Sequence, residues 1–388
     1  MLARVLILLV ILAVAESCIQ HTDCESCTRV STRVRFKIIS CRWCPFKSTC
    51  HTEGTTYHGC GDYEVALTSQ CVNATQLVIR YDSQVAEQLA KWSSLAYLNP
   101  IYYDLKSIQS AVMTQFNGRY KVVEFLLVDC EWQVLKNKRT CAAVIAKSLT
   151  ENIIIIAFKG SFPPTEINGP HEIISYTDLK TFQPTGGKIM EYSKKTHDIL
   201  FPCVKATLQR LLTSQPTAAV LITGHSDGGA QAQLAGARLR AEERVSNAKL
   251  HIYTFGSPRV GDADFAYSYN RLVGNSWRVT RREDFTPLTV SKDNYPFFHH
   301  TRREIYYHYS GVMKPSSDYE ICKSNWEESG CIEWQGRLSA KSSTRNSNQY
   351  FVPDLQSYMK EMVVKGLNHL HGYMNMDCRV MPIGRSID

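Results

Sequence analysis

The stretch AAVLITGHSDGGA, residues 218–230, decides the fold. Its first part, Ala218–Thr223, is a continuous apolar run of the length typical of a buried strand. Gly224-His225-Ser226-Asp227-Gly228 follows directly and fits the pattern G-x-S-x-G. Gly229–Arg240 then repeats small and apolar residues on one helical face. The sequence therefore predicts a strand, a tight turn and a helix in that order, with Ser226 in the turn.

A turn of this kind has a chemical consequence for the serine. It forces the residue into a strained backbone conformation and lifts the hydroxyl above the edge of the sheet. Glycines two residues before and after the serine let the strand and the helix pack closely. The context is typical of a nucleophile elbow and makes Ser226 the candidate nucleophile.

Strands and helices alternate on both sides of this turn, which predicts an α/β fold. Such alternation is typical of a mostly parallel sheet covered by helices on both faces. Together with the elbow it predicts an α/β-hydrolase. Helices are expected over Gln76–Leu98 and Tyr192–Leu212, strands over Lys121–Val128, Cys141–Ile145, Ile153–Phe158, His251–Phe255 and Ser276–Thr280, and a surface loop over Ser339–Asn348.

A serine hydroxyl needs a base and an acid, which follow it in the order Ser, Asp, His in this fold. Asp284 comes after the strand that ends near Thr280 and is the favoured acid. Glu283 would point to the other side, and Asp262 lies beyond the preceding strand.

The base is less well determined by spacing. His299 and His300 come too soon after Asp284, whereas His369 and His371 lie near the end of the chain, where the last sheet loop is expected. Spacing alone does not separate these two. His225, in the elbow, is expected to point away from the hydroxyl and to be structural.

The first residues read as a secretory signal peptide over 1–17, with Arg4 before a short apolar run. No later stretch is long enough for a transmembrane segment. The charge is mildly basic, 44 basic against 36 acidic residues, and spread along the chain, so nothing suggests nucleic acid. The densest basic pairs, Arg281-Arg282 and Arg302-Arg303, are expected on a solvated face.

Fourteen cysteines behind a signal peptide predict disulfides. Cys41 and Cys44 with His51 and His58 also suggest zinc, but an oxidising compartment disfavours it. Asn73 is a glycosylation acceptor. The expected disulfide-forming residues are Cys18, Cys24, Cys27, Cys41, Cys44, Cys50, Cys60 and Cys71, with Cys130–Cys141, Cys322–Cys331 and Cys203–Cys378 as expected pairs.

The chain resembles the class-3 lipases, the fungal triacylglycerol-lipase family. IAFKGS at 156–161 is similar to I-x-F-R-G-S, and TGHSDGGA at 223–230 to T-G-H-S-L-G-G-A. YTFGSPRVGD at 253–262 follows the family's next strand and turn, and residues 278–287 match R-V-x-x-x-x-D-x-x-P. His300 with Glu304-Ile305-Tyr306-Tyr307 resembles a structural strand near the acid. With its extra cysteines and cysteine-rich head, the layout is similar to secreted nematode lipases.

The resemblance implies Ser226 as nucleophile, Asp284 as acid and a histidine within H-x-x-Y-F as base, with no cofactor and no metal. Asn368–Met374 reads N-H-L-H-G-Y-M, in which neither histidine keeps the family's spacing to the tyrosine. His369 is preferred and His371 is the alternative. Backbone N–H groups of Ser161 and Asp227 would form the oxyanion hole.

Two departures from the family matter. Asp227 stands where the family has leucine, and a carboxylate near a developing oxyanion opposes it unless it is turned away or protonated. The segment Ser161–Gly187, where the lid helix is expected, is broken by Pro and Gly and has only scattered apolar residues, Phe162, Ile167 and Phe182. Interfacial activation is therefore in doubt, and contact with a lipid interface is expected to be transient.

The head, 18–75, resembles the plexin–semaphorin–integrin cysteine-rich module, and the lipase-like domain covers 76–388. The module's family implies the pairs Cys18–Cys41, Cys24–Cys71, Cys27–Cys50 and Cys44–Cys60; the sequence names no partner for it. The expected function is a secreted extracellular hydrolase of lipid esters. The alternatives are an inactive lipase-like binding protein and a phospholipase or other serine esterase.

Overall fold

The computed structural model describes residues 18–34, 37–44, 49–53, 81–98, 105–130, 140–160, 179–242, 244–282, 284–288, 290, 297–301, 303–308, 311–322 and 348–363. The expected signal peptide, Asn73, Cys331 and Cys378 lie outside these residues, as does all but the last residue of the expected loop 339–348. In the described parts of the chain, no helix combines the length and the apolar character needed to cross a membrane.

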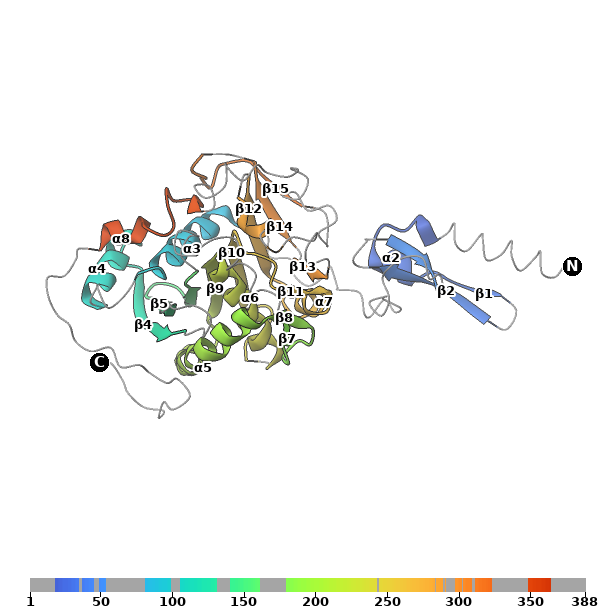
Figure 1. Cartoon of the computed structure of the whole chain (residues 1–388), viewed down its shortest axis with the longest axis horizontal. Coiled ribbons are helices and arrows are strands. Elements are labelled where there is room, and N and C mark those ends of the chain that lie inside the picture. The colour runs from blue at the N-terminus through green and yellow to red at the C-terminus, as the bar shows by residue number, and fades with distance from the viewer. Residues whose placement is uncertain are drawn as a thin grey trace, which may run out of the picture.

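A sheet of eight strands forms the centre of the larger domain, in the order β15-β14-β12-β10-β9-β6-β5-β4. The five inner strands from β14 to β6 pair in parallel, and antiparallel strands extend the sheet at both ends. The predicted mostly parallel sheet is therefore confirmed (Figure 1). The strands are β4 (Tyr120–Asp129), β5 (Thr140–Ser148), β6 (Ile153–Phe158), β9 (Ala219–His225), β10 (Leu250–Phe255), β12 (Ser276–Arg281), β14 (Glu304–Tyr307) and β15 (Tyr319–Ile321).

Helices cover both faces of this sheet because its inner strands are apolar on both sides. In β6, Ile155 and Ala157 enter one core while Ile154 and Ile156 enter the other, since successive side chains of a strand point to opposite faces. On the first face lie α3 (Ser83–Leu95), α4 (Leu105–Gln115) and α8 (Tyr358–Met362). On the second lie α5 (Glu191–Ser214), α6 (Asp227–Ala241) and α7 (Ala263–Leu272).

Aspartate side chains begin two of these helices. Asp82 accepts hydrogen bonds from the N–H groups of Gln84 (2.8 Å) and Val85 (3.2 Å) at the start of α3. Asp262 accepts one from the N–H of Phe265 (2.9 Å) at the start of α7. Because these bonds satisfy N–H groups that a helix leaves unpaired, they fix where each helix starts. Asp262, considered above as a catalytic acid, therefore serves as a helix cap.

A second sheet of four short antiparallel strands, β13-β11-β8-β7, adjoins α7. Its strands are β7 (Leu179–Thr181), β8 (Lys188–Met190), β11 (Gly261–Asp262) and β13 (Phe298–His299). Phe182, in the turn between β7 and β8, is buried and packs edge-on against Phe265 and His197. The description of Phe182 as a scattered apolar residue of a lid segment is therefore wrong, because it belongs to the core.

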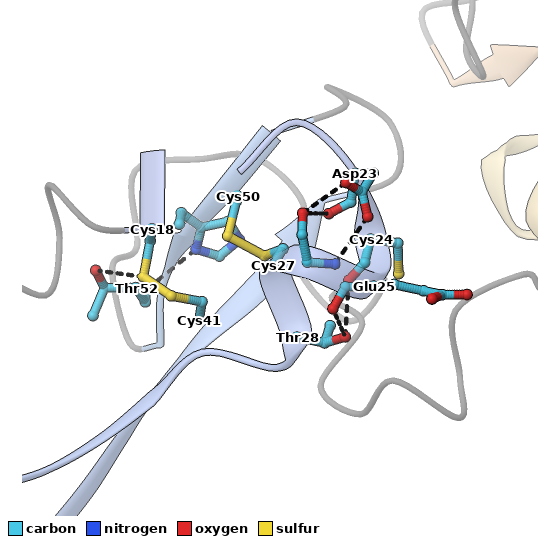
Figure 2. The surroundings of a disulfide bond; sticks show 11 residues. Cys18, Asp23, Cys24, Glu25, Cys27, Thr28, Cys41, Cys50 and Thr52 are labelled. Carbon is cyan, nitrogen blue, oxygen red and sulfur yellow. Dashed lines mark hydrogen bonds between the residues drawn. A yellow bond between two sulfur atoms is a disulfide. The ribbon is translucent and has the colours of Figure 1, made fainter. Parts of the chain in front are cut away.

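The cysteine-rich head contains α2 (Cys24–Thr28) and a sheet of β1 (Ser31–Val34), β2 (Lys37–Cys44) and β3 (Thr49–Thr52). Disulfides join Cys18 to Cys41 and Cys27 to Cys50, the pairs implied by the module's family (Figure 2). Cys41 is therefore not available as a zinc ligand.

Other cysteines also form disulfides. Cys130 and Cys141 close the β4–β5 hairpin, as predicted. The remaining described cysteines, Cys24, Cys44, Cys203 and Cys322, are disulfide-bonded, and the residues proposed as their partners lie outside the described residues.

His197 on α5 gives the fold a dependence on pH. Its ring is fully buried, stacks on Phe201 at 4.7 Å, and neither ring nitrogen has a hydrogen-bond partner among the described residues. Burial, reinforced by the charges of Arg238 and Lys194, holds the pKa of His197 well below its ordinary value of 6.5. Below pH 6.5 His197 is protonated in the unfolded chain but stays neutral in the folded chain. The free energy of unfolding therefore decreases as the pH falls.

We expect His197→Phe to remove this loss. For one such group the wild type loses up to about 1.4 kcal/mol of unfolding free energy for each pH unit below the ordinary histidine pKa. Urea unfolding from pH 7 to pH 4.5 measures it, as the difference between variant and wild type. The exposed His308 provides the control, as His308→Gln. Parallel curves for wild type and His197→Phe would contradict this assignment.

Candidate active site

Ser226 occupies the turn between β9 and α6 with the backbone angles expected of an elbow. Its φ is 56° and its ψ −128°, a region that side-chain-bearing residues rarely adopt. Its N–H donates to the carbonyl of Phe255 (2.9 Å), and its own carbonyl accepts from the N–H of Gly229 (2.8 Å). These bonds to β10 and to the first turn of α6 hold the strained conformation.

The glycines on either side of Ser226 are required by contact with backbone. A Cβ on Gly224 would lie 2.1 Å from the carbonyl oxygen of Gly228. A Cβ on Gly228 would lie 2.3 Å from the carbonyl oxygen of Phe158, at the end of β6. Backbone atoms cannot yield as a flexible side chain can. The two glycines therefore let α6 start directly against the ends of β9 and β6.

Asp284 lies at the same edge of the sheet as Ser226. β9, β10 and β12 are neighbouring parallel strands, with His225 opposite Phe255 and Phe255 opposite Val279. The carboxylate of Asp284, just beyond β12, lies so close to Gly256 that a Cβ there would be 2.5 Å from Oδ2. The candidate nucleophile Ser226 and the candidate acid Asp284 therefore flank the carboxyl end of β10, the edge where α/β sheets bind their ligands.

The surroundings of Asp284 hold its carboxylate in one orientation. The side chain is fully buried, Oδ1 accepts from the N–H of Thr286 (2.8 Å) and Oδ2 accepts from the hydroxyl of Tyr350. Burial raises the pKa of Asp284, and the bonds from Tyr350 and Thr286 and the charge of Arg281 oppose that rise. Burial also raises the pKa of Tyr350, so its phenol keeps the proton that it donates.

Tyr350 was missed by the sequence prediction. Its ring lies 5.8 Å from that of Phe255 and 6.0 Å from that of His225, while Phe351 packs against Phe255 and Tyr307. The signal was available, because Tyr350-Phe351 matches both of the last two letters of H-x-x-Y-F, whereas Tyr373-Met374 matches only the tyrosine. The residue at the histidine position of this match is Ser347.

We expect Tyr350→Phe to move the acid limb of any hydrolysis that uses Asp284 to higher pH. Loss of the donor raises the pKa of the carboxyl further, so it protonates at higher pH. The unfolding free energy should fall by about 1–3 kcal/mol, because a buried carboxylate loses a donor. A pH profile of kcat/KM measures the limb. Tyr81→Phe, which removes a hydroxyl bonded to that of Tyr307, is the control; an unmoved limb in Tyr350→Phe would refute the expectation.

The expectation that the basic pairs lie on a solvated face is wrong for Arg281 but holds for Arg282, which is exposed; Arg302 lies outside the described residues. Arg281 is fully buried at the end of β12 and donates to the carbonyl of Gln349, and its charge favours ionised Asp284. Arg303 is half-buried, with its guanidinium bonded to the carbonyl of Gly274. Arg281 thus helps to hold the 348–351 segment against the acid.

Of the other candidate residues, two histidines lie in the described part of the chain and the rest do not. His300 is buried and its Nε2 lies 2.9 Å from the carbonyl oxygen of Pro287, which fits a structural role. His225 is buried, with Nδ1 2.8 Å from the hydroxyl of Tyr97. Ser161, Glu283, His369 and His371 lie outside the described residues. Within the described part of the chain, Asp284 accepts hydrogen bonds from Tyr350 and Thr286. No histidine of the described residues contacts its carboxylate through a hydrogen bond.

Asp227 begins α6 directly after the nucleophile and is half-buried. A carboxylate in the first turn of a helix is favoured by the helix dipole. Its charge contributes to raising the pKa of the Tyr97 phenol, after the larger effect of burial. The Asp227 carboxylate therefore acts electrostatically on the Tyr97 phenol.

The sheet, the elbow and Asp284 beyond β12 define an α/β-hydrolase fold.

Residues 155–294 match the family described as Lipase (class 3). Over 190 residues the chain is 32% identical to a lipase of Rhizopus niveus, a match covering 48% of this chain and 45% of that lipase. Over 149 residues it is 30% identical to a lipase of Caenorhabditis elegans, covering 38% and 40% of the two chains.

Solved structures agree on the fold. Lipase II of Rhizopus niveus superposes with a TM-score of 0.56 at 23% identity, covering 70% of this chain and 95% of that one. In sequence, the chain spans less than half the length of the two curated lipases, 45% and 40%.

Proposed function

We propose that the protein is a serine carboxylic ester hydrolase acting on lipid esters, of triacylglycerol-lipase type. The observation that carries the proposal is the strained turn at Ser226, with φ of 56°, between a buried parallel strand and α6. Asp284 is the acid. His369 is the proposed base, with His371 as the alternative. The match to the class-3 lipase family supports the substrate class.

The proposed mechanism has two steps. The hydroxyl oxygen of Ser226 attacks the ester carbonyl as the base takes its proton; the C–O bond breaks, the alcohol leaves with that proton, and an acyl-enzyme remains. Water, deprotonated by the same base, then releases the fatty acid and restores the serine. The N–H groups of Ser161 and Asp227 stabilise the negative oxygen in both steps. No cofactor or metal takes part.

We further propose that the protein is secreted, with residues 1–17 removed, a cysteine-rich module over 18–75 and the hydrolase domain over 76–388. The disulfides Cys18–Cys41, Cys27–Cys50 and Cys130–Cys141 support an oxidising compartment. Asn73 would then carry a glycan. The partners are a lipid ester and, transiently, its interface.

Hydrolysis of short- and long-chain p-nitrophenyl esters by the secreted protein tests the proposal, beside labelling of Ser226 by an active-site phosphonate. We expect turnover and labelling together, and a preference along the chain-length series that tells lipase from esterase. A parallel phospholipid panel separates other serine esterases. A folded protein that neither turns over nor labels would refute the enzyme proposal.

One observation favours a second candidate, a lipase-like protein that binds lipid esters without cleaving them. Tyr350 and Phe351 pack beside Asp284 and Phe255, and the residue three positions before Tyr350 is Ser347 instead of the histidine of H-x-x-Y-F. Asp227 in place of leucine points the same way. Binding of a lipid ester by a protein that does not react with the phosphonate would support this candidate.

A further inference from the structure

Tyr97 joins the first helical layer to the elbow. It follows α3, is 1% exposed, and its hydroxyl lies 2.8 Å from Nδ1 of His225, the residue before Ser226. The two rings are 5.9 Å apart and tilted by 52°, so the contact is through the hydroxyl and not through stacking. Which of the two atoms donates depends on the tautomer of His225.

The same hydroxyl touches the end of β6. A Cβ on Gly160 would lie 2.2 Å from the hydroxyl oxygen of Tyr97 and 2.3 Å from the carbonyl oxygen of His225. Gly160 is therefore enclosed between the phenol and the backbone of the elbow. The next residue is Ser161, whose N–H is the proposed oxyanion donor.

We propose that Tyr97 is a positioning residue for the elbow and for the oxyanion donor that the elbow carries, the N–H of Asp227. By bonding His225 while contacting Gly160, it fixes the spacing between the elbow and the backbone that follows β6. Such donors lower the barrier only when they are already in place as charge develops on the ester oxygen. This proposal rests on the proposed hydrolase function.

The surroundings keep the phenol neutral and fixed. Burial and the negative charges of Asp227 and Asp354 raise the pKa of Tyr97, and the Gln356 side chain is hydrogen-bonded to it. A protonated phenol bonds His225 throughout the pH range in which an ester hydrolase would be assayed. Its replacement by phenylalanine removes one oxygen and leaves the ring in place.

Tyr97→Phe tests the proposal, with Tyr269→Phe as the matched control. Tyr269 is also 1% exposed, and its hydroxyl also forms a 2.8 Å hydrogen bond, to Ser276 Oγ, but on α7, away from the elbow. We expect kcat for p-nitrophenyl esters to fall at least about 10-fold in Tyr97→Phe with KM nearly unchanged, since the lost interaction acts in the transition state. Wild-type kcat in a folded Tyr97→Phe, or equal losses in both variants, would overturn the proposal.

A second measurement separates this proposal from the proposed function. Amide hydrogen exchange of the peptide that contains Lys159 and Gly160 should be faster in Tyr97→Phe than in wild type, and unchanged in Tyr269→Phe. If the wild type shows no turnover, the proposed function fails while exchange still reports whether Tyr97 holds the end of β6. Unchanged exchange in Tyr97→Phe would overturn the positioning role.

Discussion

Replacing Ser226 by alanine should abolish ester hydrolysis, with a loss in kcat of about 10⁴-fold or more, because no other group forms the acyl-enzyme. The backbone at Ser226 has φ of 56° in the wild type, and alanine accepts this strained conformation about as well as serine does. The variant should therefore keep the elbow and the fold. Initial rates with p-nitrophenyl esters and a thermal melt of the same samples measure the two effects.

Ser193→Ala provides the matched control. Ser193 is a fully buried serine on α5, and within the part of the chain that the structure describes its hydroxyl has no hydrogen-bond partner. This substitution also removes one buried hydroxyl oxygen, yet we expect the rate to stay at the wild-type level. Activity that survives in Ser226→Ala would mean that another residue, or a contaminating enzyme, performs the hydrolysis.

Ser347→His tests whether the wild type lacks a catalytic base, and in that case it should have the second large effect, a gain in rate. If Tyr350-Phe351 is this chain's counterpart of the family's Y-F, a histidine at 347 supplies the general base that the pattern H-x-x-Y-F requires. General base catalysis contributes roughly 10²–10⁴-fold. If neither His369 nor His371 serves as the base, we expect a gain of about that size in kcat/KM, dependent on Asp284, whose carboxylate is bonded to Tyr350; if one of them does, we expect no gain.

Companion variants define what such a gain would mean. Asp284→Asn combined with Ser347→His should lose the gain, and Ser343→His, four residues earlier in the chain, should show none. His369→Ala and His371→Ala test the base proposed above. If the rate of His369→Ala or His371→Ala falls sharply below that of the wild type, and Ser347→His shows no gain, the base lies in the C-terminal segment. That result would also contradict the binding-protein candidate.

Local sequence was sufficient for the elements and for the elbow turn at Ser226. The run Ile153–Phe158 is a strand with the predicted bounds, and the elbow lies at Ser226, because both depend on interactions between near neighbours in the chain. Apolar side chains that alternate between two cores require a sheet covered on both faces, and G-x-S-x-G leaves little choice of turn. The position of the proposed acid, Asp284, near the elbow also followed from chain order, since the edge of a parallel sheet gathers the ends of neighbouring strands.

Contacts between residues far apart in the chain could be identified only from the tertiary structure. Tyr350 meets Asp284 across 66 positions, and Tyr97 meets His225 across 128. Arg281 looks like a surface charge in sequence, yet it is buried because the carbonyl of Gln349, 68 residues away, and the neighbouring carboxylate of Asp284 face it. Composition and periodicity indicate which apolar side chains are buried. A buried polar group is stable only when it has a hydrogen-bond or charge partner, and that partner can come from a distant part of the chain. For this reason the elbow at Ser226 could be predicted from local sequence, whereas the side chains that contact Asp284 and the elbow could be identified only from the fold.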